Sequence, residues 1–296
     1  MFILGGLKVE TNVSVLLTIR NAEKYIGSCL TSLLNQTFSN FDIVIVDDES
    51  NDKTKEIIEE FEDPRIRYFR SKRRLGLSAS RNKCLKYATG NYVFFTDGDC
   101  LVSKTWIEEG LKHLKTSNSI GVEGKTYYVS KEYKPTRSDD VVENKNGGQY
   151  PTCNMAYKKS VLNNIGGFDE RYTYMEDRDL ALRASRFGKI SFNPNMVVYH
   201  QKKTLTSREF VQKAKIIRNR VLIYKKLHDT SFFTWRIVFP MNLVAIFFPP
   251  LIIHSFFSRR YRTKEDFDLF PFIYVGLIYE RLNFWDMCAR EKIFLI

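Results

Sequence analysis

The stretch that decides the fold is FDIVIVDD at residues 41–48, a largely apolar, β-branched run that ends in two aspartates. A similar run, VSVLLTI, stands upstream at residues 13–19, and YVFFTDGD stands downstream at residues 92–99. Runs of this length and composition are typical of β-strands. The first hundred residues therefore predict a sheet at the centre of the molecule.

Segments with helical spacing lie between these runs. In the first of them Ile26, Leu30 and Leu33 repeat at the period of a helix. We predict strands at Val13–Ile19, Phe41–Val46, Ile66–Phe69 and Tyr92–Phe95, and helices at Glu23–Asn35, from a cap in Ser50–Asp52 through Phe61, and at Ser78–Ala88 before Gly90. Alternation of this kind indicates βαβ units, hence an α/β, Rossmann-like, mostly parallel sheet with flanking helices.

Acidic residues follow two of the predicted strands. Asp47 and Asp48 end one strand, and Asp97 and Asp99 follow another. Ligands bind at the carboxyl ends of strands in open parallel sheets, so both clusters are expected at one binding edge. Either cluster alone could consist of turn formers and helix caps, but two at the same edge favour a site.

The middle of the chain is less regular. Residues Ser130–Gln149 are polar and rich in turn formers, which predicts a loop. Helices are expected at Lys158–Asn164 and Glu176–Phe187, and a short strand at Met196–Tyr199, which ends at His200.

The C-terminal third predicts a helical extension that is both apolar and basic. Ser207 can cap a long helix with an apolar stripe and a lysine- and arginine-rich face. Ile237–Phe257 carries no charged residue and is followed at once by basic residues, and a second apolar stretch covers Leu269–Tyr279. The length of Ile237–Phe257 suits a bilayer, but its prolines weaken a spanning helix. A spanning segment, an interfacial segment and an apolar core all remain open.

Composition narrows the class of protein. The chain has 296 residues, 44% of them hydrophobic, and a formal net charge of +12, which favours anionic partners. No nucleic-acid recognition motif accompanies this charge, so we predict no nucleic-acid partner. Its five cysteines are scattered without a C-x-x-C pair, and residues 1–10 lack the pattern of a secretory signal. A reducing, cytosolic environment is expected.

Seven ordered motifs in this chain resemble those of family 2 glycosyltransferases. They are VSVLLTIRN from Val13, SLLNQTF from Ser32, IVIVDDESND from Ile43, GLSASRN from Gly76, FTDGD from Phe95, and GGFDE with EDRDL from Gly166 and Glu176. The resemblance covers about residues 10–200 and implies a GT-A fold. We therefore expect a catalytic domain at residues 10–205, with a nucleotide-sugar-binding half at 10–100 and an acceptor half at 101–205, followed by a helical region at 206–296.

The resemblance also implies how a nucleotide-sugar donor would be bound. Thr18 and Asp48 match positions that contact the nucleotide base, and Arg20 and Glu23 are weaker candidates for the same pocket. Arg81 matches a basic position near the diphosphate, where its fork of donors is useful. The alternative for Arg81 is a solvated helix arginine.

Carboxylate oxygens are suitable ligands for Mn²⁺ or Mg²⁺, which would bridge to the diphosphate. By resemblance, Asp99 is the firmer metal ligand, Asp97 lies near the ribose and metal, and His200 supplies a further contact. The alternatives are a strand-end turn for the aspartates and a histidine without a ligand.

Glu176 and Asp177 resemble an acidic pair that opens a helix beside the acceptor. We expect Asp177 to act as the general base of an inverting displacement, with Glu176 orienting or contacting the acceptor. The alternative is that both acids only stabilise a helix N-terminus.

The function that follows is transfer of a sugar from a nucleotide-diphosphate sugar, favoured to be UDP-linked, to a lipid-linked, glycan or other surface acceptor. A non-catalytic nucleotide-sugar-binding module is the alternative. The basic, apolar C-terminal region predicts an anionic membrane surface as partner and a place on the cytoplasmic face of the cell membrane, with a soluble cytoplasmic protein as the other reading.

Overall fold

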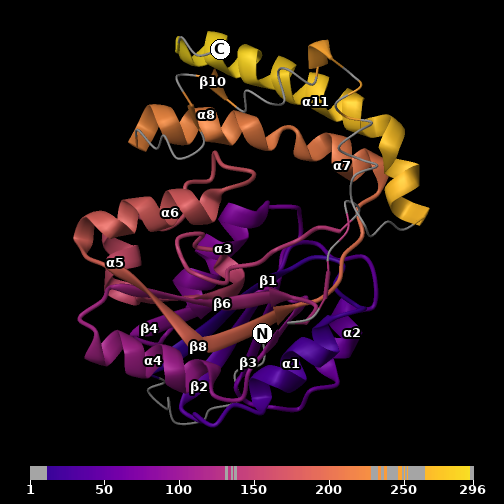
Figure 1. Ribbon diagram of the computed structural model, residues 1–296. Helices are drawn as coiled ribbons and strands as arrows, with labels where there is room; N and C mark the ends of the chain where they lie inside the picture. The colour runs from indigo at the N-terminus through magenta and orange to yellow at the C-terminus, as the bar shows by residue number, and fades with distance from the viewer. Residues whose placement is uncertain are drawn as a thin grey trace. The chain divides into compact units, whose positions relative to one another are not determined.

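The computed structural model describes residues 12–130, 133–134, 136, 139–227, 233–234, 237–238, 246–248, 250, 252 and 264–293 (Figure 1). Its contacts divide the chain into two compact units. The first comprises the chain up to Val129 together with Val142–Arg171 and Glu176–Gln201. The second comprises Ser130–Val141, Tyr172–Met175 and Lys202–Ile296.

The first unit begins with four parallel strands. They are β1 (Val13–Ile19), β2 (Phe41–Asp47), β3 (Ile66–Arg70) and β4 (Tyr92–Phe95), which lie in the order β3-β2-β1-β4. The connecting helices are α1 (Ile26–Leu34), α2 (Thr54–Glu59) and α3 (Leu77–Tyr87). The parallel βαβ arrangement of this half is the one that the sequence predicts.

The rest of the first unit extends this sheet to eight strands. The added elements are β5 (Cys100–Val102), α4 (Trp106–Thr116), β6 (Gly121–Tyr128), the 3-10 turn η1 (Thr152–Asn154), β7 (Met155–Lys158), α5 (Lys159–Asn164), α6 (Glu176–Ala184), the 3-10 turn η2 (Ser185–Phe187) and β8 (Ile190–His200). The complete order is β3-β2-β1-β4-β7-β6-β8-β5. Because β7 pairs antiparallel with β4 and β6, and β5 pairs antiparallel with β8, the sheet is mixed.

Both faces of the sheet are covered by helices. Alternate residues of β1 point to opposite faces, so Val15 joins the core under α1 and α4, whereas Leu16 joins the core under α3, α5 and α6. This is why the first strands show no polar face. The result is an α/β fold with flanking helices (Figure 1).

Some element boundaries differ from the predicted ones. The residue before α2 is Lys53, which makes no side-chain cap, while Asp52 accepts hydrogen bonds from the Thr54 backbone and hydroxyl. The strand predicted at Met196–Tyr199 is the end of the much longer β8, whose start was missed because Asn193, Pro194 and Asn195 interrupt its apolar pattern.

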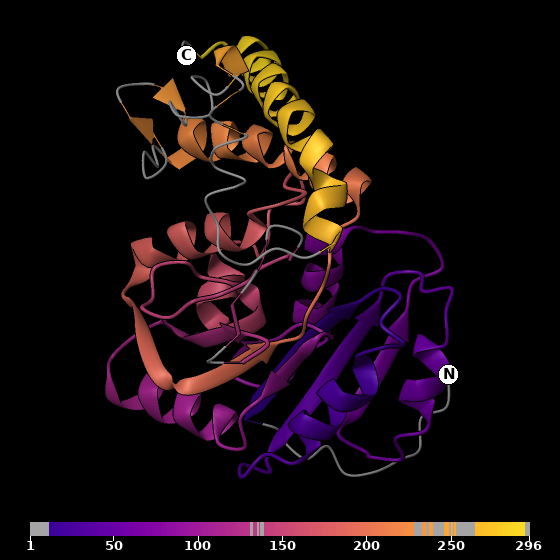
Figure 2. The same cartoon turned by 45° about the vertical axis from the view of Figure 1, so that its right-hand side comes forward.

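A bulge in β8 explains that interruption. The pairing of β6 with β8 shifts between Gly124, opposite Asn193, and Lys125, opposite Val197, so residues 194–196 are extra. Figure 2 shows β8, in orange-red, as a bent strand. A buried polar side chain holds the bend, because the Asn154 amide donates to the Met196 carbonyl at 3.1 Å.

The second unit is mainly helical. It contains α7 (Ser207–Lys213), α8 (Ile216–Leu227) and α11 (Lys264–Glu291), with the short strands β9 (Phe233–Thr234) and β10 (Ile237–Val238). The single long helix that we predicted from Ser207 is divided into α7 and α8. Its N-cap is Thr206, which forms a capping box with Glu209.

The helices of the second unit pack through one face of α8. Ile217 and Val221 contact Phe284 and Cys288 of α11, and Arg218 forms an ion pair with Asp286 beside them. The predicted apolar stripe of this region is therefore in part a helix–helix interface.

Within the described residues, no helix combines the length and the apolar character needed to cross a bilayer. Most of Ile237–Phe257, the segment with the strongest predicted affinity for a membrane, lies outside the described residues, and so does part of the predicted loop Ser130–Gln149.

The close packing at the bulge yields a prediction. A methyl group on Gly124 would lie 2.2 Å from the Met196 carbonyl oxygen and 2.4 Å from Asn154 Oδ1, so Gly124→Ala must displace backbone. We expect a loss of about 1–3 kcal/mol in the free energy of unfolding, measured by urea denaturation.

Gly27, in α1, is the matched control. Its added methyl would meet Ile57 Cγ2 at an ordinary 3.5 Å, so Gly27→Ala should leave stability unchanged or raise it by up to about 1 kcal/mol. Equal effects of the two substitutions would contradict the packing described at the bulge.

Candidate active site

The carboxyl ends of β1, β2 and β4 bring the predicted residues to one edge of the sheet. Thr18 stands opposite Val46 and Ile19 opposite Asp47 in the β1–β2 pair. On the other side of β1, the Thr96 amide donates to the Leu16 carbonyl, which places Asp97 directly beyond the sheet. The two acidic clusters therefore share one edge, as the sequence predicts.

Asp47 and Asp48 face different surroundings. Asp47 is fully buried and accepts hydrogen bonds from the Ser50 amide at 2.8 Å and the Tyr68 hydroxyl at 2.6 Å. Asp48 accepts from the amides of Leu75 at 2.6 Å and Gly76 at 3.0 Å. Asp48 thus fixes the turn that starts α3, and its oxygens keep further lone pairs for a ligand.

The other candidates for the base pocket differ in exposure. Arg20 and Glu23 are exposed, and Glu23 accepts a hydrogen bond from the Lys53 amide at 3.0 Å. The Thr18 hydroxyl is buried and, among the residues that the structure describes, has no hydrogen-bond partner; the same holds for Ser80 and Thr96. Buried hydroxyls normally have partners, and those of Thr18 and Thr96 stand at the strand ends, an edge suited to a polar ligand.

Arg81, on α3, connects two motifs that are far apart in the sequence, FTDGD and EDRDL. Its guanidinium is buried and donates to Glu176 Oε1 and, at 3.3 Å, to Asp97 Oδ1. Burial disfavours the charged guanidinium, but Glu176 and Asp97 outweigh it and raise the pKa of Arg81. The solvated helix arginine considered for this position is therefore excluded, and a contact with a diphosphate stays a prediction.

Asp177 adjoins this ion-paired group. It is half-buried at the start of α6, and its Oδ1 accepts the Arg178 amide at 2.7 Å. Burial, followed by the charge of Glu176, raises the pKa of Asp177 to about 7, against the lowering effect of Arg81. The residue before the helix, Met175, has a φ of 61°, a conformation that long side chains rarely adopt and that is often found at functional sites.

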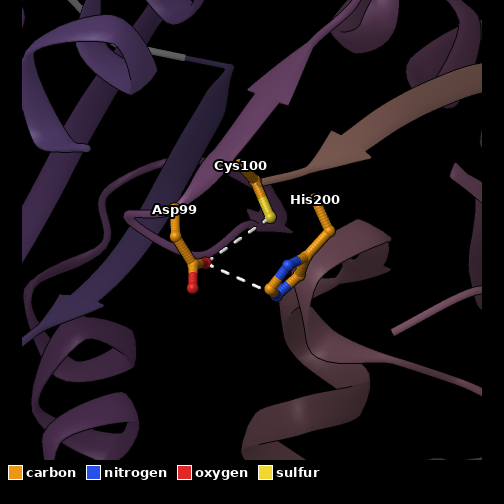
Figure 3. A group of neighbouring side chains, drawn as sticks. All are labelled: Asp99, Cys100 and His200. Carbon is orange, nitrogen blue, oxygen red and sulfur yellow. Dashed lines mark hydrogen bonds and ion pairs between the residues drawn. The ribbon is translucent and has the colours of Figure 1, made fainter. Parts of the chain in front are cut away.

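Asp99 and His200 meet at the ends of β5 and β8. His200 Nε2 lies 3.5 Å from Asp99 Oδ1, and its Nδ1 lies 3.0 Å from the Gln201 carbonyl oxygen. Cys100 is the third member of the group, with its Sγ 3.9 Å from the same Asp99 oxygen. Figure 3 shows the three side chains converging.

This group fits a divalent cation. A carbonyl oxygen only accepts, so Nδ1 of His200 must carry the proton that it shares with Gln201, and Nε2 of a neutral imidazole then presents a lone pair. That lone pair faces a carboxylate oxygen at 3.5 Å, an arrangement that a cation or a second proton between the two acceptors would stabilise. Imidazole and carboxylate are both ligands of Mn²⁺, and the backbone carbonyl fixes the ring as in many metal sites.

Sequence reasoning missed the roles of Asn82 and Cys100, which both shape the site. The Asn82 amide accepts from the Phe168 amide at 2.8 Å and donates to its carbonyl at 2.9 Å, which holds the GGFDE segment against α3. Arg81 lies 5.6 Å from the Phe168 ring centre. The sequence analysis counted Cys100 only as one of the scattered cysteines. Its place opposite His200 depends on the pairing of β5 with β8, which no local sequence pattern reveals.

The mixed sheet with its flanking helices is a GT-A fold. TarS from S. aureus (residues 1–349, in complex with UDP) aligns with a TM-score of 0.59 at 20% identity, over 96% of this chain and 93% of that one. The mannosyltransferase PcManGT from Pyrobaculum calidifontis, in complex with GDP-Man and Mn²⁺, aligns with a TM-score of 0.61 at 15% identity, over 93% and 87%.

The chain belongs to glycosyl transferase family 2, whose model matches residues 14–214. Glycosyltransferase GlyA from Streptococcus pneumoniae serotype 4 is 30% identical over 62% of this chain, which spans only 24% of GlyA. WfaP from Escherichia coli, a UDP-Glc:α-D-GlcNAc-diphosphoundecaprenol β-1,3-glucosyltransferase by name, is 29% identical over 57% of this chain and 68% of WfaP.

The buried ion pairs of Arg81 yield a prediction. Arg81→Met would leave Glu176 and Asp97 without their cation, and Glu176 is buried. We expect a loss of about 3–5 kcal/mol in the free energy of unfolding, measured by urea denaturation. The exposed Arg186 provides the control, because Arg186→Met should change stability by less than about 0.5 kcal/mol. A similar small effect at Arg81 would show that the guanidinium does not hold the site together.

Proposed function

We propose that this chain transfers a sugar, with inversion, from a nucleotide-diphosphate sugar to an acceptor hydroxyl, with Asp177 as the general base. The observation that carries the proposal is the bridge of Arg81 between Asp97 and Glu176, which gathers the strand-end and helix-start acids at one edge. The family to which the chain belongs supports the same reaction class.

Asp177 has the properties of a base that works at neutral pH. A carboxylate with an ordinary pKa is a weak base, whereas burial and Glu176 raise the pKa of Asp177 to about 7. Arg81 forms an ion pair with Glu176, which keeps this carboxylate beside Asp177. Asp177 would take the proton of the acceptor hydroxyl as its oxygen attacks the anomeric carbon from the face opposite the leaving diphosphate.

The donor would be held by the remaining residues of this edge. We assign Thr18 and Asp48 to the base, with Arg20 and Glu23 at the border of the pocket, and Asp97 to the ribose. Arg81 has five N–H donors, so its two ion pairs leave capacity for the diphosphate. Asp99 and His200, with Asp97, would hold Mn²⁺ or Mg²⁺, which neutralises charge on the leaving diphosphate when bound.

The donor is proposed to be a UDP-sugar and the acceptor lipid-linked or a glycan. Asp48 can accept from the ring N–H of uracil. UDP is bound in the TarS structure, and the name of WfaP specifies UDP-glucose and a diphosphoundecaprenol-linked acceptor. GDP and dTDP sugars belong in the same screen, because PcManGT binds GDP-Man.

The substitution Asp177→Asn tests the base. With Mn²⁺, a panel of UDP-, GDP- and dTDP-sugars and a diphosphoundecaprenol-linked GlcNAc acceptor, we expect wild type to release nucleotide diphosphate. Asp177→Asn should lower that rate by about 10²–10⁴-fold while donor affinity, measured by calorimetry, is kept. Because the carboxylate must be deprotonated, wild-type kcat/KM should rise with pH and level off above about 7.

Glu109→Gln, in the first turn of α4, is the matched control for an acid that only stabilises a helix N-terminus. It should leave turnover unchanged. Full activity of Asp177→Asn, or a rate independent of pH between 5 and 8, would remove Asp177 from the reaction. Donor binding without release from any sugar would favour the non-catalytic binding module.

We further propose that the second unit binds an anionic membrane surface on the cytoplasmic face. On α11 the side chains of Phe267, Val275, Leu282 and Trp285 are each 45–55% exposed and recur at helical spacing along one stripe. A groove of about 580 Å³ beside this helix is lined by Phe272 and Val275 together with Arg208 and Lys215. Apolar side chains next to basic ones, in a chain of net charge +12, are typical of interfacial helices.

Vesicle sedimentation checks the membrane proposal. Full-length protein should pellet with phosphatidylglycerol-containing vesicles and less with neutral ones, and Leu282→Ser with Trp285→Ser should weaken binding by at least about tenfold. Phe187→Ser removes an equally exposed aromatic from the first unit and serves as the control. Unchanged sedimentation of the double variant would contradict the role given to α11.

A further inference from the structure

Cys100 lies where a metal ligand would lie. It stands directly opposite His200 in the antiparallel pair of β5 and β8, so the two side chains share one face of the sheet. Asp99 is the residue before β5, and its carboxylate approaches both partners from the strand end (Figure 3). Three different donor atoms therefore converge from two neighbouring strands.

The spacing of these atoms is close to that of a tetrahedral site. Asp99 Oδ1 lies 3.5 Å from His200 Nε2 and 3.9 Å from Cys100 Sγ, and the ligand atoms of all three residues lie within 4.8 Å of one another. Metal–ligand bonds of 2.0–2.3 Å in a tetrahedron separate ligand atoms by roughly 3.5 Å. Shifts of the side chains by an ångström or less would close the set.

The composition of the set decides which metal it prefers. Mn²⁺ and Mg²⁺ are hard ions that bind oxygen and imidazole, whereas thiolate selects borderline and soft ions such as Zn²⁺. An aspartate, a histidine and a cysteine with a fourth position for water form a normal zinc coordination sphere.

We propose that Cys100 gives the Asp99–His200 site a second mode of occupancy, in which Zn²⁺ is bound by the Cys100 thiolate, the Asp99 carboxylate and the His200 imidazole. As the metal–sulfur bond forms, the thiol proton passes to solvent. The zinc form is tight and excludes the Mn²⁺ or Mg²⁺ that a diphosphate needs, so Zn²⁺ inhibits by displacement. The inference rests on the proposed metal site at Asp99 and His200, but not on transferase activity.

Cobalt substitution tests the thiolate directly. Full-length protein stripped of metal by a chelator is titrated with Co²⁺, which is spectroscopically visible in the place of Zn²⁺. We expect visible d–d bands that report metal in the site, and in addition a near-ultraviolet band from thiolate-to-cobalt charge transfer. Cys100→Ser should lose the second band and weaken Zn²⁺ by at least about tenfold in calorimetry, the loss that even an outer partner of a metal ligand causes, with Mn²⁺ affinity kept.

The matched control is Cys84→Ser, which alters an equally buried thiol on α3 that bonds to the Leu17 carbonyl. This variant should keep the charge-transfer band. Zinc-edge X-ray absorption of the wild type needs no variant and should show one sulfur at about 2.3 Å.

The outcomes separate the two proposals. No d–d band and no Mn²⁺ binding would overturn the metal site of the proposed function together with the thiolate. Normal d–d bands without charge transfer, or a charge-transfer band that survives in Cys100→Ser, would overturn the role of Cys100 alone.

Discussion

The guanidinium of Arg81 is buried between the carboxylates of Asp97 and Glu176, which the chain supplies from a strand end and from a helix start. A buried cation without partners costs several kcal/mol, and so does the buried acid Glu176, so these two groups are tolerated only together. Their mutual dependence fixes where α6 begins relative to β4. Asp177 is the next residue along that helix, and its environment is a consequence of this arrangement.

The surroundings at this edge differ for Glu176 and Asp177, two acids that are adjacent in sequence. Glu176 pairs with the Arg81 guanidinium, whereas burial and the neighbouring charge of Glu176 raise the pKa of Asp177 to about 7. Two carboxylates in different surroundings commonly take different roles at one site. The same logic applies to His200, whose tautomer is set by the Gln201 carbonyl and whose other nitrogen then faces Asp99.

The mixed sheet supplies the site with a residue, His200, that its first four parallel strands do not carry. β1, β2 and β4 supply the acidic edge, whereas His200 arrives at the end of β8, a bent strand that pairs with both β6 and β5. The bend depends on Asn154, Gly124 and the extra residues at 194–196, none of which lies in a motif. The chain belongs to glycosyl transferase family 2, and it spans only 24% of GlyA.

The sequence by itself determined the parallel half of the sheet and the residues at its edge. Buried strands such as Val13–Ile19 are unmistakable because both faces must be apolar, and acids such as Asp97 stand out because they follow such runs. Local pattern did not reveal the antiparallel strands or the full length of β8, because short strands and a bulge leave no regular period.

Only the tertiary structure decided what the individual side chains face. The burial of Arg81, the pKa of Asp177 and the place of Cys100 opposite His200 all depend on pairings between residues far apart in the chain, 95 positions in the case of Arg81 and Glu176. Such pairings are set by how strands and helices pack, which a one-dimensional pattern does not encode. The kinds of chemical group were readable from the sequence, whereas their charges and neighbours were not.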